Sequence, residues 1–342
     1  MAAMDLPVDL TALATWMDGQ GLGAGPIEQA ELLSGGTQNI LLRFVRAGRT
    51  YVLRRPPEHK RDNSDETMRR EARVLTALSG GPVPHPEVVA ACPTTEELGA
   101  AFYLTEFVDG FNPTTGLPPL HAGDPAVRHR MGLAMVEAIA ALGGLDHEAL
   151  GLADLGKPDG YLERQVGRWR TQLESYSAME GYPGPDIPGV DDVATWLDDR
   201  RPATYRPGII HGDFHLANVL FRPDGPELAA VVDWELTTIG DPLIDLGWLL
   251  ATWPDPGAPG PAPQVTEDGY PTPSELVEHY GACSDRDLAA IDWFAVLACY
   301  KLGIILEGTH ARAFAGRAPQ ATGDLLHAMT VGLFERALAR IG

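Results

Sequence analysis

The sequence predicts an α+β fold divided into two lobes, and three observations support this prediction. The first third of the chain reads as strand, glycine turn, strand, short turn and strand, which is typical of an antiparallel sheet. The rest reads as a series of helices around one β-hairpin. The chain has 342 residues, of which 44% are hydrophobic, and this supplies more apolar side chains than one small domain requires.

The first lobe is expected to begin with a helix over residues 5–18, because its apolar residues recur at helical spacing. Strands are expected over residues 27–33, 40–45, 50–54, 87–92 and 101–107. Residues 65–78 carry one apolar helical face, and Glu71 lies on it. Burial of an unpaired charge costs several kcal/mol, so Glu71 needs a partner. We expect Arg54 to be that partner, and a salt bridge to a flanking arginine is the alternative.

The second lobe is expected to be mostly helical. Its predicted helices cover residues 125–142, 160–176, 190–200, 243–252, 273–281, 285–308 and 319–340. Between Trp253 and Pro273 the chain is rich in Pro and Gly, which indicates a surface loop, expected near the entrance for a small-molecule substrate. Trp253, beside this loop, is a candidate contact for that substrate.

The hairpin of the second lobe concentrates the polar side chains. Two strand-like runs, Val219 to Phe221 and Leu228 to Val232, are separated by Arg-Pro-Asp-Gly-Pro, a strong reversal signal. The polar residues directly outside these runs are His211, Asp213 and Asn218 before the first and Asp233 after the second. One hairpin thereby brings carboxylates and a carboxamide to the same end. Such oxygen ligands suit Mg²⁺ beside substrate phosphates, and a nearby Asp can orient an attacking hydroxyl.

These residues carry a family resemblance. Residues 211–218 read His-Gly-Asp-Phe-His-Leu-Ala-Asn, and residues 231–235 read Val-Val-Asp-Trp-Glu. Both segments resemble the catalytic loop and metal-binding segment of the aminoglycoside phosphotransferase and choline kinase-like families, which share the protein-kinase fold. The resemblance implies that Asp213 is the catalytic base and that His211 braces its loop. It also implies that Asn218 and Asp233 are the Mg²⁺ ligands.

The segment after the hairpin extends the resemblance. Residues 240–247 read Gly-Asp-Pro-Leu-Ile-Asp-Leu-Gly, similar to these kinases, in which the second Asp supports the catalytic loop. That residue is Asp245 here, and a helix-start residue that accepts backbone N–H bonds is the alternative. His215 is expected to be an ordinary loop or surface histidine.

The resemblance places ATP on the first lobe. A turn with two glycines flanked by Ser and Thr can aim backbone N–H groups at phosphate oxygens, although it is also an ordinary hairpin signal. The residues of this turn are Ser34, Gly35, Gly36 and Thr37. Arg54 stands where kinases carry the phosphate-holding lysine, and arginine can engage phosphate bidentately.

The family's interlobe linker, which contacts adenine, corresponds here to Glu106, Phe107 and Val108. This division implies a nucleotide-binding lobe over residues 1–108 and a catalytic lobe over residues 109–342.

Composition excludes several classes of partner. A formal net charge of −21 argues against nucleic acid and anionic membranes as partners. Residues 43–73 differ from the rest, because they hold ten basic against five acidic side chains, which suits an anionic ligand.

The sequence also predicts the compartment. No apolar run approaches the roughly 20 residues that cross a bilayer, and the N-terminus lacks a basic signal region. The three cysteines show no metal-ligand spacing. We therefore expect buried free thiols in a cytoplasmic protein.

The sequence thus predicts an ATP- and Mg²⁺-dependent phosphotransferase, monomeric or homodimeric, that acts on a small-molecule hydroxyl. The acceptor stays open between a polycationic aminoglycoside, drawn by acidic charge, and a hydroxyacyl compound. The second option follows from residues 160–166 and the strand end at Arg54, which resemble kinase-like domains fused to acyl-CoA dehydrogenases in some relatives. Two other classes remain: a catalytically silent nucleotide-binding protein, because arginine replaces lysine, and a metallohydrolase, because His211, Asp213 and His215 alternate.

Overall fold

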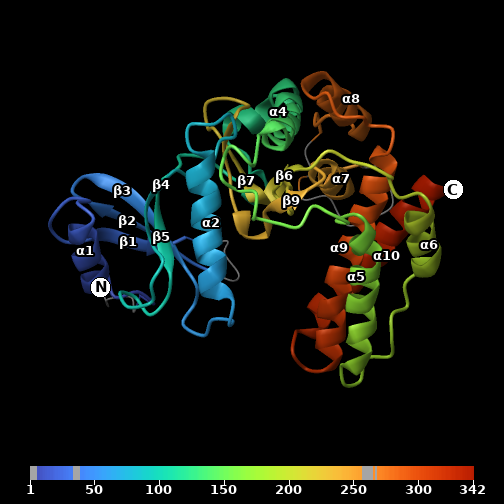
Figure 1. Cartoon of the computed structure of the whole chain (residues 1–342), viewed down its shortest axis with the longest axis horizontal. Coiled ribbons are helices and arrows are strands. Elements are labelled where there is room, and N and C mark those ends of the chain that lie inside the picture. The colour runs from blue at the N-terminus through green and yellow to red at the C-terminus, as the bar shows by residue number, and fades with distance from the viewer. Residues whose placement is uncertain (1–5, 34–38, 256–264, 266–267) are drawn as a thin grey trace. The chain divides into compact units, whose positions relative to one another are not determined.

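The computed structural model describes residues 6–33, 39–255, 265 and 268–342, and these form two compact units (Figure 1). Unit 1 comprises residues 1–110 and 229–237, and unit 2 comprises residues 111–228 and 238–342. The division into continuous lobes at residues 108 and 109 stays a prediction. Within the described residues, no helix combines the length and apolar character that a bilayer crossing requires.

Unit 1 is built on an antiparallel five-stranded sheet with the strand order β1-β2-β3-β5-β4. The strands are β1 (Glu28–Leu32), β2 (Ile40–Arg46), β3 (Arg49–Arg55), β4 (Val88–Cys92) and β5 (Phe102–Glu106). Leu42 lies opposite Leu53, and Leu53 lies opposite Leu104, so one face of three adjacent strands is apolar. Buried and partly buried residues alternate along β2 and β3, as a half-buried strand requires.

Helix α1 (Leu10–Gly19) places Leu13 and Met17 in the core of this sheet. The predicted start at residue 5 is wrong, because the Asp9 side chain accepts hydrogen bonds from the backbone N–H groups of Thr11 and Ala12. This N-cap fixes the beginning of the helix at Leu10.

Helix α2 (Ser64–Leu78) packs on β4 and β5 (Figure 1). It buries Glu71 among its apolar residues, as the sequence predicted. Residues 229–237 belong to the same unit. The backbone N–H of Val231 donates to Pro84 O at 2.8 Å, and Arg70 of α2 donates to Thr237 O at 2.6 Å. These bonds hold Asp233, which lies between them in sequence, in unit 1.

Unit 2 is mostly helical, as predicted. Its helices are α3 (Pro119–Gly123), α4 (Pro125–Gly144), α5 (Glu163–Ser175), α6 (Val190–Asp199), α7 (Leu243–Thr252), α8 (Pro273–Cys283), α9 (Ile291–Phe314) and α10 (Gln320–Ile341). Helices α5, α9 and α10 run side by side (Figure 1). The short strands β6 (Gly208–Ile210) and β9 (Thr238–Gly240) pair antiparallel, and the sequence did not predict them. Strand β7 (Val219–Phe221) pairs with β8 (Leu228–Val231) in the predicted hairpin, and β8 passes into unit 1 at residue 229.

The predicted bounds of α9, residues 285–308, are wrong at both ends. The side chains of Ser284 and Asp287 accept backbone N–H bonds two residues further on, and such local bonds compete with helix formation. At the other end the helix continues to Phe314, because Ala311 and Ala313 are still buried. The α+β fold class is confirmed despite these differences.

The three cysteines are free thiols. Cys92 and Cys299 are buried, as predicted, whereas Cys283 at the end of α8 is exposed. The prediction of burial is therefore wrong for Cys283.

Candidate active site

Each unit has a polar centre that is a candidate functional site, and the two centres are described separately. The centre of unit 1 is organised by Arg54 on β3. Its Nε donates to Glu71 Oε2 at 3.0 Å, and its Nη2 donates to Asp233 Oδ1 at 2.7 Å. The Glu71 side chain is 1% exposed, so the guanidinium supplies the positive charge that this carboxylate needs. The predicted pairing of Arg54 with Glu71 is confirmed. Asp233 is a further partner that the sequence did not reveal.

Electrostatics couple these groups closely. Burial raises the pKa of Glu71 to about 7, and the positive charge of Arg54 opposes that rise. A hydrogen bond from Tyr103 on β5 also stabilises the ionised carboxylate. Tyr103 lies directly opposite Arg54 in the β3–β5 pairing, and sequence reasoning missed it. The strand register is the signal that could have found it.

Asp233 has a left-handed backbone conformation, with φ 67° and ψ 60°, which is uncommon for a residue other than glycine. It follows β8 and precedes a 3₁₀ turn (Trp234–Leu236). Its side chain is 39% exposed, so the carboxylate is accessible while Arg54 holds one of its oxygens. Strain of this kind persists only where the surrounding bonds enforce it.

The centre of unit 2 is the loop between β6 and β7, and it presents Asp213. The side chain of Asp213 is 28% exposed, and its Oδ1 lies 3.4 Å from His215 Nε2. Burial alone would raise the pKa of Asp213, but the hydrogen bond and charge of His215, with the charges of His211 and Lys301, lower it below the ordinary value. Asp213 is therefore ionised at neutral pH. His215 lies in the loop, as expected, and its ring also contacts Asp213.

Asn218 ends the 3₁₀ turn Leu216–Asn218 and faces Asp213. Its Nδ2 donates at 3.0 Å to both Asp213 O and Asp213 Oδ2. The amide nitrogen is thereby fixed on Asp213, and the carboxamide oxygen faces away from it. Asn112 secures the same turn, since its Nδ2 donates to Ala217 O at 2.6 Å.

Asp245, in the first turn of α7, holds the backbone of this loop by hydrogen bonds. Its carboxylate accepts the backbone N–H groups of His211 at 2.6 Å and Gly212 at 2.8 Å. Burial is nearly complete and raises the pKa of Asp245 to about 6, although the two N–H bonds favour the ionised form. Of the two roles that the sequence left open, loop support is the one observed. His211 is itself fully buried, in keeping with a bracing role.

Lys301 of α9 is a functional candidate that sequence reasoning missed. Its ammonium donates to Gly212 O at 3.1 Å and lies over the ring of Trp248, 4.2 Å from the centroid. Burial lowers its pKa to about 8, although the charges of Asp213 and Asp245 favour the protonated form. A single lysine within the apolar run of α9 was the available signal.

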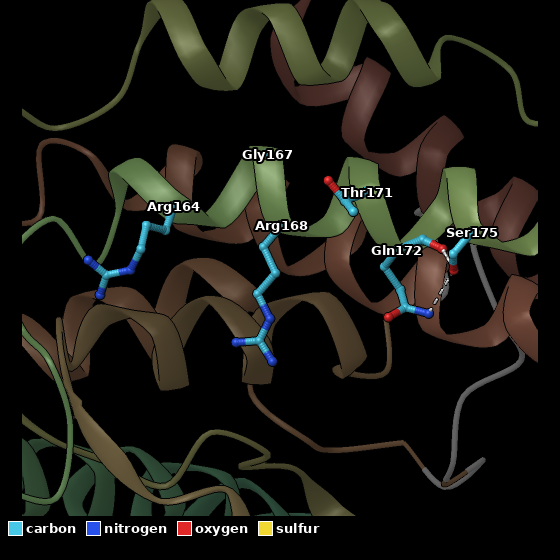
Figure 2. Close-up of a pocket in the computed structure, with 6 residues that line it drawn as sticks. All are labelled: Arg164, Gly167, Arg168, Thr171, Gln172 and Ser175. Carbon is cyan, nitrogen blue, oxygen red and sulfur yellow. Dashed lines mark hydrogen bonds between the residues drawn. The ribbon is translucent and has the colours of Figure 1, made fainter.

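A hollow of about 550 Å³ runs along the exposed side of α5 (Figure 2). Its lining residues are Arg164, Gly167, Arg168, Thr171, Gln172 and Ser175. Arg164 donates to Lys157 O at 2.7 Å, whereas the Arg168 guanidinium lies over the Trp169 ring, 5.2 Å from its centroid. The charge of Arg168 helps to lower the pKa of Lys301. We call this feature the α5 hollow.

Other predicted site residues have different outcomes. Ser34, Gly35, Gly36 and Thr37 lie outside the described residues. Glu106 pairs with Arg49, and Phe107 lies under the Arg43 guanidinium, 4.6 Å from the ring centroid. Nucleotide contacts of Glu106, Phe107 and Val108 stay predictions.

Two further expectations concern unit 2. Trp253 is 2% exposed and its Nε1 donates to Pro271 O at 2.7 Å, so its prediction as an acceptor contact is wrong. Within the described part of the chain, His211, Asp213 and His215 are not among the groups whose ligand atoms all lie within 4.8 Å of one another.

Comparison with known sequences identifies relatives along most of the chain. A model described as "Phosphotransferase enzyme family" matches residues 29–278. Acyl-CoA dehydrogenase family member 10 of Mus musculus is 31% identical over 321 residues, which cover 92% of this chain and 29% of the relative. Acyl-CoA dehydrogenase family member 11 of Homo sapiens is 30% identical over 325 residues, which cover 90% of this chain and 40% of the relative. The chain therefore spans less than half of the length of these relatives.

Solved structures agree with this assignment. A Ralstonia eutropha JMP134 protein provisionally described as an aminoglycoside phosphotransferase has a TM-score of 0.80 and 30% identity, with 97% of this chain and 99% of that chain covered. The GDP complex of aminoglycoside 2'-phosphotransferase-IIIa has a TM-score of 0.64 and 17% identity, with 98% and 100% covered, and shows a common fold. The predicted protein-kinase-like fold class is confirmed. The chain belongs to the phosphotransferase enzyme family, with the kinase-like fold of the aminoglycoside phosphotransferases.

Proposed function

We propose that this chain transfers the γ-phosphoryl group of ATP to the hydroxyl of a small-molecule acceptor, with Asp213 as the catalytic base. The observation that carries the proposal is the state of Asp213, which is partly exposed, held by Asn218 and His215, and kept ionised by a lowered pKa. A carboxylate in this state can orient an attacking hydroxyl and accept its proton. Asp245 and His211 keep the loop in shape and do not touch the acceptor in this scheme.

For the nucleotide, we assign Arg54 to the phosphates, together with the turn at residues 34–37. Glu71 fixes the guanidinium from the buried side, so part of the side-chain entropy is already lost before ATP binds. Glu106, Phe107 and Val108 are proposed to contact the adenine. Structures of relatives in complex with GDP and with ADP support the use of a nucleotide.

The residues available for magnesium fit a hard cation. Asn218 offers a carboxamide oxygen that its own bonds leave directed away from Asp213, and Asp233 offers a carboxylate oxygen that Arg54 does not occupy. We propose these two residues as the ligands. Bound Mg²⁺ would neutralise negative charge on the β- and γ-phosphate oxygens.

The proposed acceptor is a hydroxyacyl compound. Arg164 and Arg168 line the α5 hollow, and their positive charges would attract a carboxylate or a coenzyme A phosphate and repel a polycation. The similarity to acyl-CoA dehydrogenase family members points in the same direction. A cytoplasmic location and a monomeric or homodimeric state stay predictions.

One observation favours a second candidate, a silent nucleotide-binding protein. Arg54 is already engaged by two carboxylates, which could hold it away from phosphate. Incubation with ATP labelled at the γ-position, Mg²⁺ and a panel of hydroxy acids, hydroxyacyl-CoA thioesters and aminoglycosides distinguishes the two. We expect label on a hydroxyacyl compound with the wild type and almost none with Asp213→Asn. ATP binding without transfer to any acceptor would instead support the silent protein.

A further inference from the structure

Helices α9 and α10 each carry a carboxylate and a histidine three residues apart. The pairs are Glu307 with His310 on α9 and Asp324 with His327 on α10. A spacing of i, i+3 places both members of a pair on the same face of their helix. The two helices pack against each other along their length (Figure 1). Metal sites in helical bundles are built from such pairs on facing helices.

The four side chains meet, and we call them the α9–α10 cluster. His327 Nδ1 lies 2.7 Å from Glu307 Oε2, and His310 Nδ1 lies 3.6 Å from Asp324 Oδ1. The two imidazole rings stack with centroids 4.5 Å apart and planes 20° from parallel. Ligand atoms of Glu307, His310 and His327 all lie within 4.8 Å of one another.

Burial makes this arrangement informative. Glu307 is fully buried and His310 is 9% exposed, so the polar atoms of both side chains need hydrogen-bond or metal partners within the protein. His310 Nδ1 is buried and has no hydrogen-bond partner. A buried nitrogen without a partner is costly, because it has lost its hydrogen bonds to water and gained none in the protein. A simple ion pair between Glu307 and His327 would account for those two residues, but it leaves His310 Nδ1 unexplained.

Neighbouring residues orient the cluster as outer groups orient metal ligands. Tyr182 donates from its hydroxyl to Glu307 Oε1 at 2.6 Å, and Gln320 donates to Asp324 Oδ1 at 2.7 Å. Gly323 lets the start of α10 approach α9 closely, since a Cβ there would lie 2.6 Å from Ala313 Cβ. The two helices therefore come together where the ligands gather.

We propose that Glu307, His310 and His327, with Asp324 as the fourth ligand, bind a zinc ion that joins α9 to α10. Two imidazoles and two carboxylates are an ordinary donor set for Zn²⁺. Bonds of about 2.0 to 2.1 Å in a tetrahedral site put the donor atoms roughly 3.3 Å apart, a separation that the cluster approaches before any adjustment. Because Lys301 lies on the same helix, the ion would also stiffen the element that contacts the loop of Asp213.

A second group of possible ligands, Glu137, His279 and Cys283, is a weaker candidate. Arg130 already binds both carboxylate oxygens of Glu137, at 2.7 and 2.8 Å. A positive charge in that position disfavours a metal cation. His279 therefore provides an internal comparison for the test.

The test measures Zn²⁺ binding by the full chain after treatment with EDTA, without nucleotide, by titration and elemental analysis. We expect one tightly bound equivalent in the wild type. His310→Gln and His327→Gln should weaken binding by at least about 100-fold, and Tyr182→Phe, which removes a bond to a ligand, by roughly 10- to 100-fold. His59→Gln changes an exposed histidine of unit 1 and His279→Gln changes the second group; both should bind like the wild type.

Co²⁺ gives an independent readout, since a four-coordinate site produces a visible absorption band that the two histidine variants should lack. Melting temperatures in EDTA establish whether the variants fold. If a histidine variant does not fold, Zn²⁺ binding by Tyr182→Phe and Asp324→Asn is compared with the wild type instead. No bound equivalent in the wild type would overturn the proposal. Unchanged binding in the cluster variants, or loss of binding only in His279→Gln, would overturn it as well.

Discussion

The polar centre of unit 1 and the polar centre of unit 2 are built in different ways. Around Arg54 the bonds join side chain to side chain, with two carboxylates on one guanidinium. Around Asp213 most bonds join side chain to backbone, from Asp245, Asn218 and Lys301 to the loop itself. In unit 1 the contacts balance the charges of buried side chains, whereas in unit 2 the contacts fix the backbone conformation of a loop. Substitutions in the first centre should therefore change stability and nucleotide binding, and those in the second should change turnover.

The largest expected effect is on turnover in unit 2. Asp213→Asn removes the proton acceptor but keeps the size of the side chain, so kcat should fall by roughly 10²- to 10⁴-fold. Nucleotide affinity, measured by calorimetry, should change little, because the proposed nucleotide contacts lie in unit 1. A loss of nucleotide affinity equal to the loss of kcat would remove the distinction between the centres.

In unit 1, Arg54→Met leaves Glu71 buried without its cation. We expect the free energy of unfolding to fall by about 3 to 5 kcal/mol, because breaking a buried pair exposes the full cost of the remaining charge. Urea denaturation measures this change. Glu71→Gln added to Arg54→Met should recover part of it, whereas Arg49→Met, at the exposed end of the same strand, should cost about 1 kcal/mol or less. Equal losses for the two arginine variants would contradict this account.

Asp245→Asn tests whether loop geometry alone controls turnover. Asparagine offers one acceptor oxygen where the carboxylate offers two, so one of the N–H groups of His211 and Gly212 loses its partner. Misplacement of a catalytic group can cost on the order of 100-fold, and we expect a loss of that size in kcat. Asp224→Asn, in the exposed hairpin turn, is the matched control and should keep full activity.

The free energy of unfolding should depend on pH through Asp245. Burial raises the pKa of Asp245 to about 6 from its ordinary value of 3.8, so the folded protein binds more protons than the unfolded chain between these values. Its contribution to the free energy of unfolding is therefore full at lower pH and is lost as the pH rises through about 6. The stability difference between wild type and Asp245→Asn should fall between about pH 4 and 6 and then level off. A difference that rises over this range would contradict the raised pKa.

The smallest expected effect concerns the α5 hollow. Arg168→Gln should raise KM for an anionic acceptor by about fivefold, equivalent to about 1 kcal/mol, because an exposed charge contributes little in water. The effect should shrink at high salt. Arg170→Gln, on the same helix but outside the lining of the hollow, is the control. An equal KM in both variants would place the acceptor elsewhere.

The sequence predicted those parts of the molecule whose signals are local. Strand positions, the apolar stripe of α2 and the isolated carboxylate on it were enough to pair Arg54 with Glu71. The hairpin followed from its turn residues. The start of α1 was misplaced because a single cap at Asp9 overrides the apolar periodicity before it.

The rest depends on contacts between residues distant in sequence. Lys301 lies 89 positions from the carbonyl of Gly212 that it binds, so no motif contains both. The role of His215 follows from the fold of its loop toward Asp213, which alternation along the chain does not specify. Strands β6 and β9 are three residues each, too short for a periodic pattern. The α9–α10 cluster combines residues of two separate helices, so it depends on how these helices pack and not on a local sequence pattern.

The central claim, transfer of a phosphoryl group from ATP to a hydroxyl, is tested most directly by stoichiometry. ATP consumed and phosphate ester formed should be measured in one reaction with a hydroxyacyl-CoA thioester as acceptor. The account predicts one ester for each ATP consumed, with both rates lost together in Asp213→Asn. Consumption of ATP with release of free phosphate alone, or binding of ATP without consumption in the presence of every acceptor tested, would contradict it.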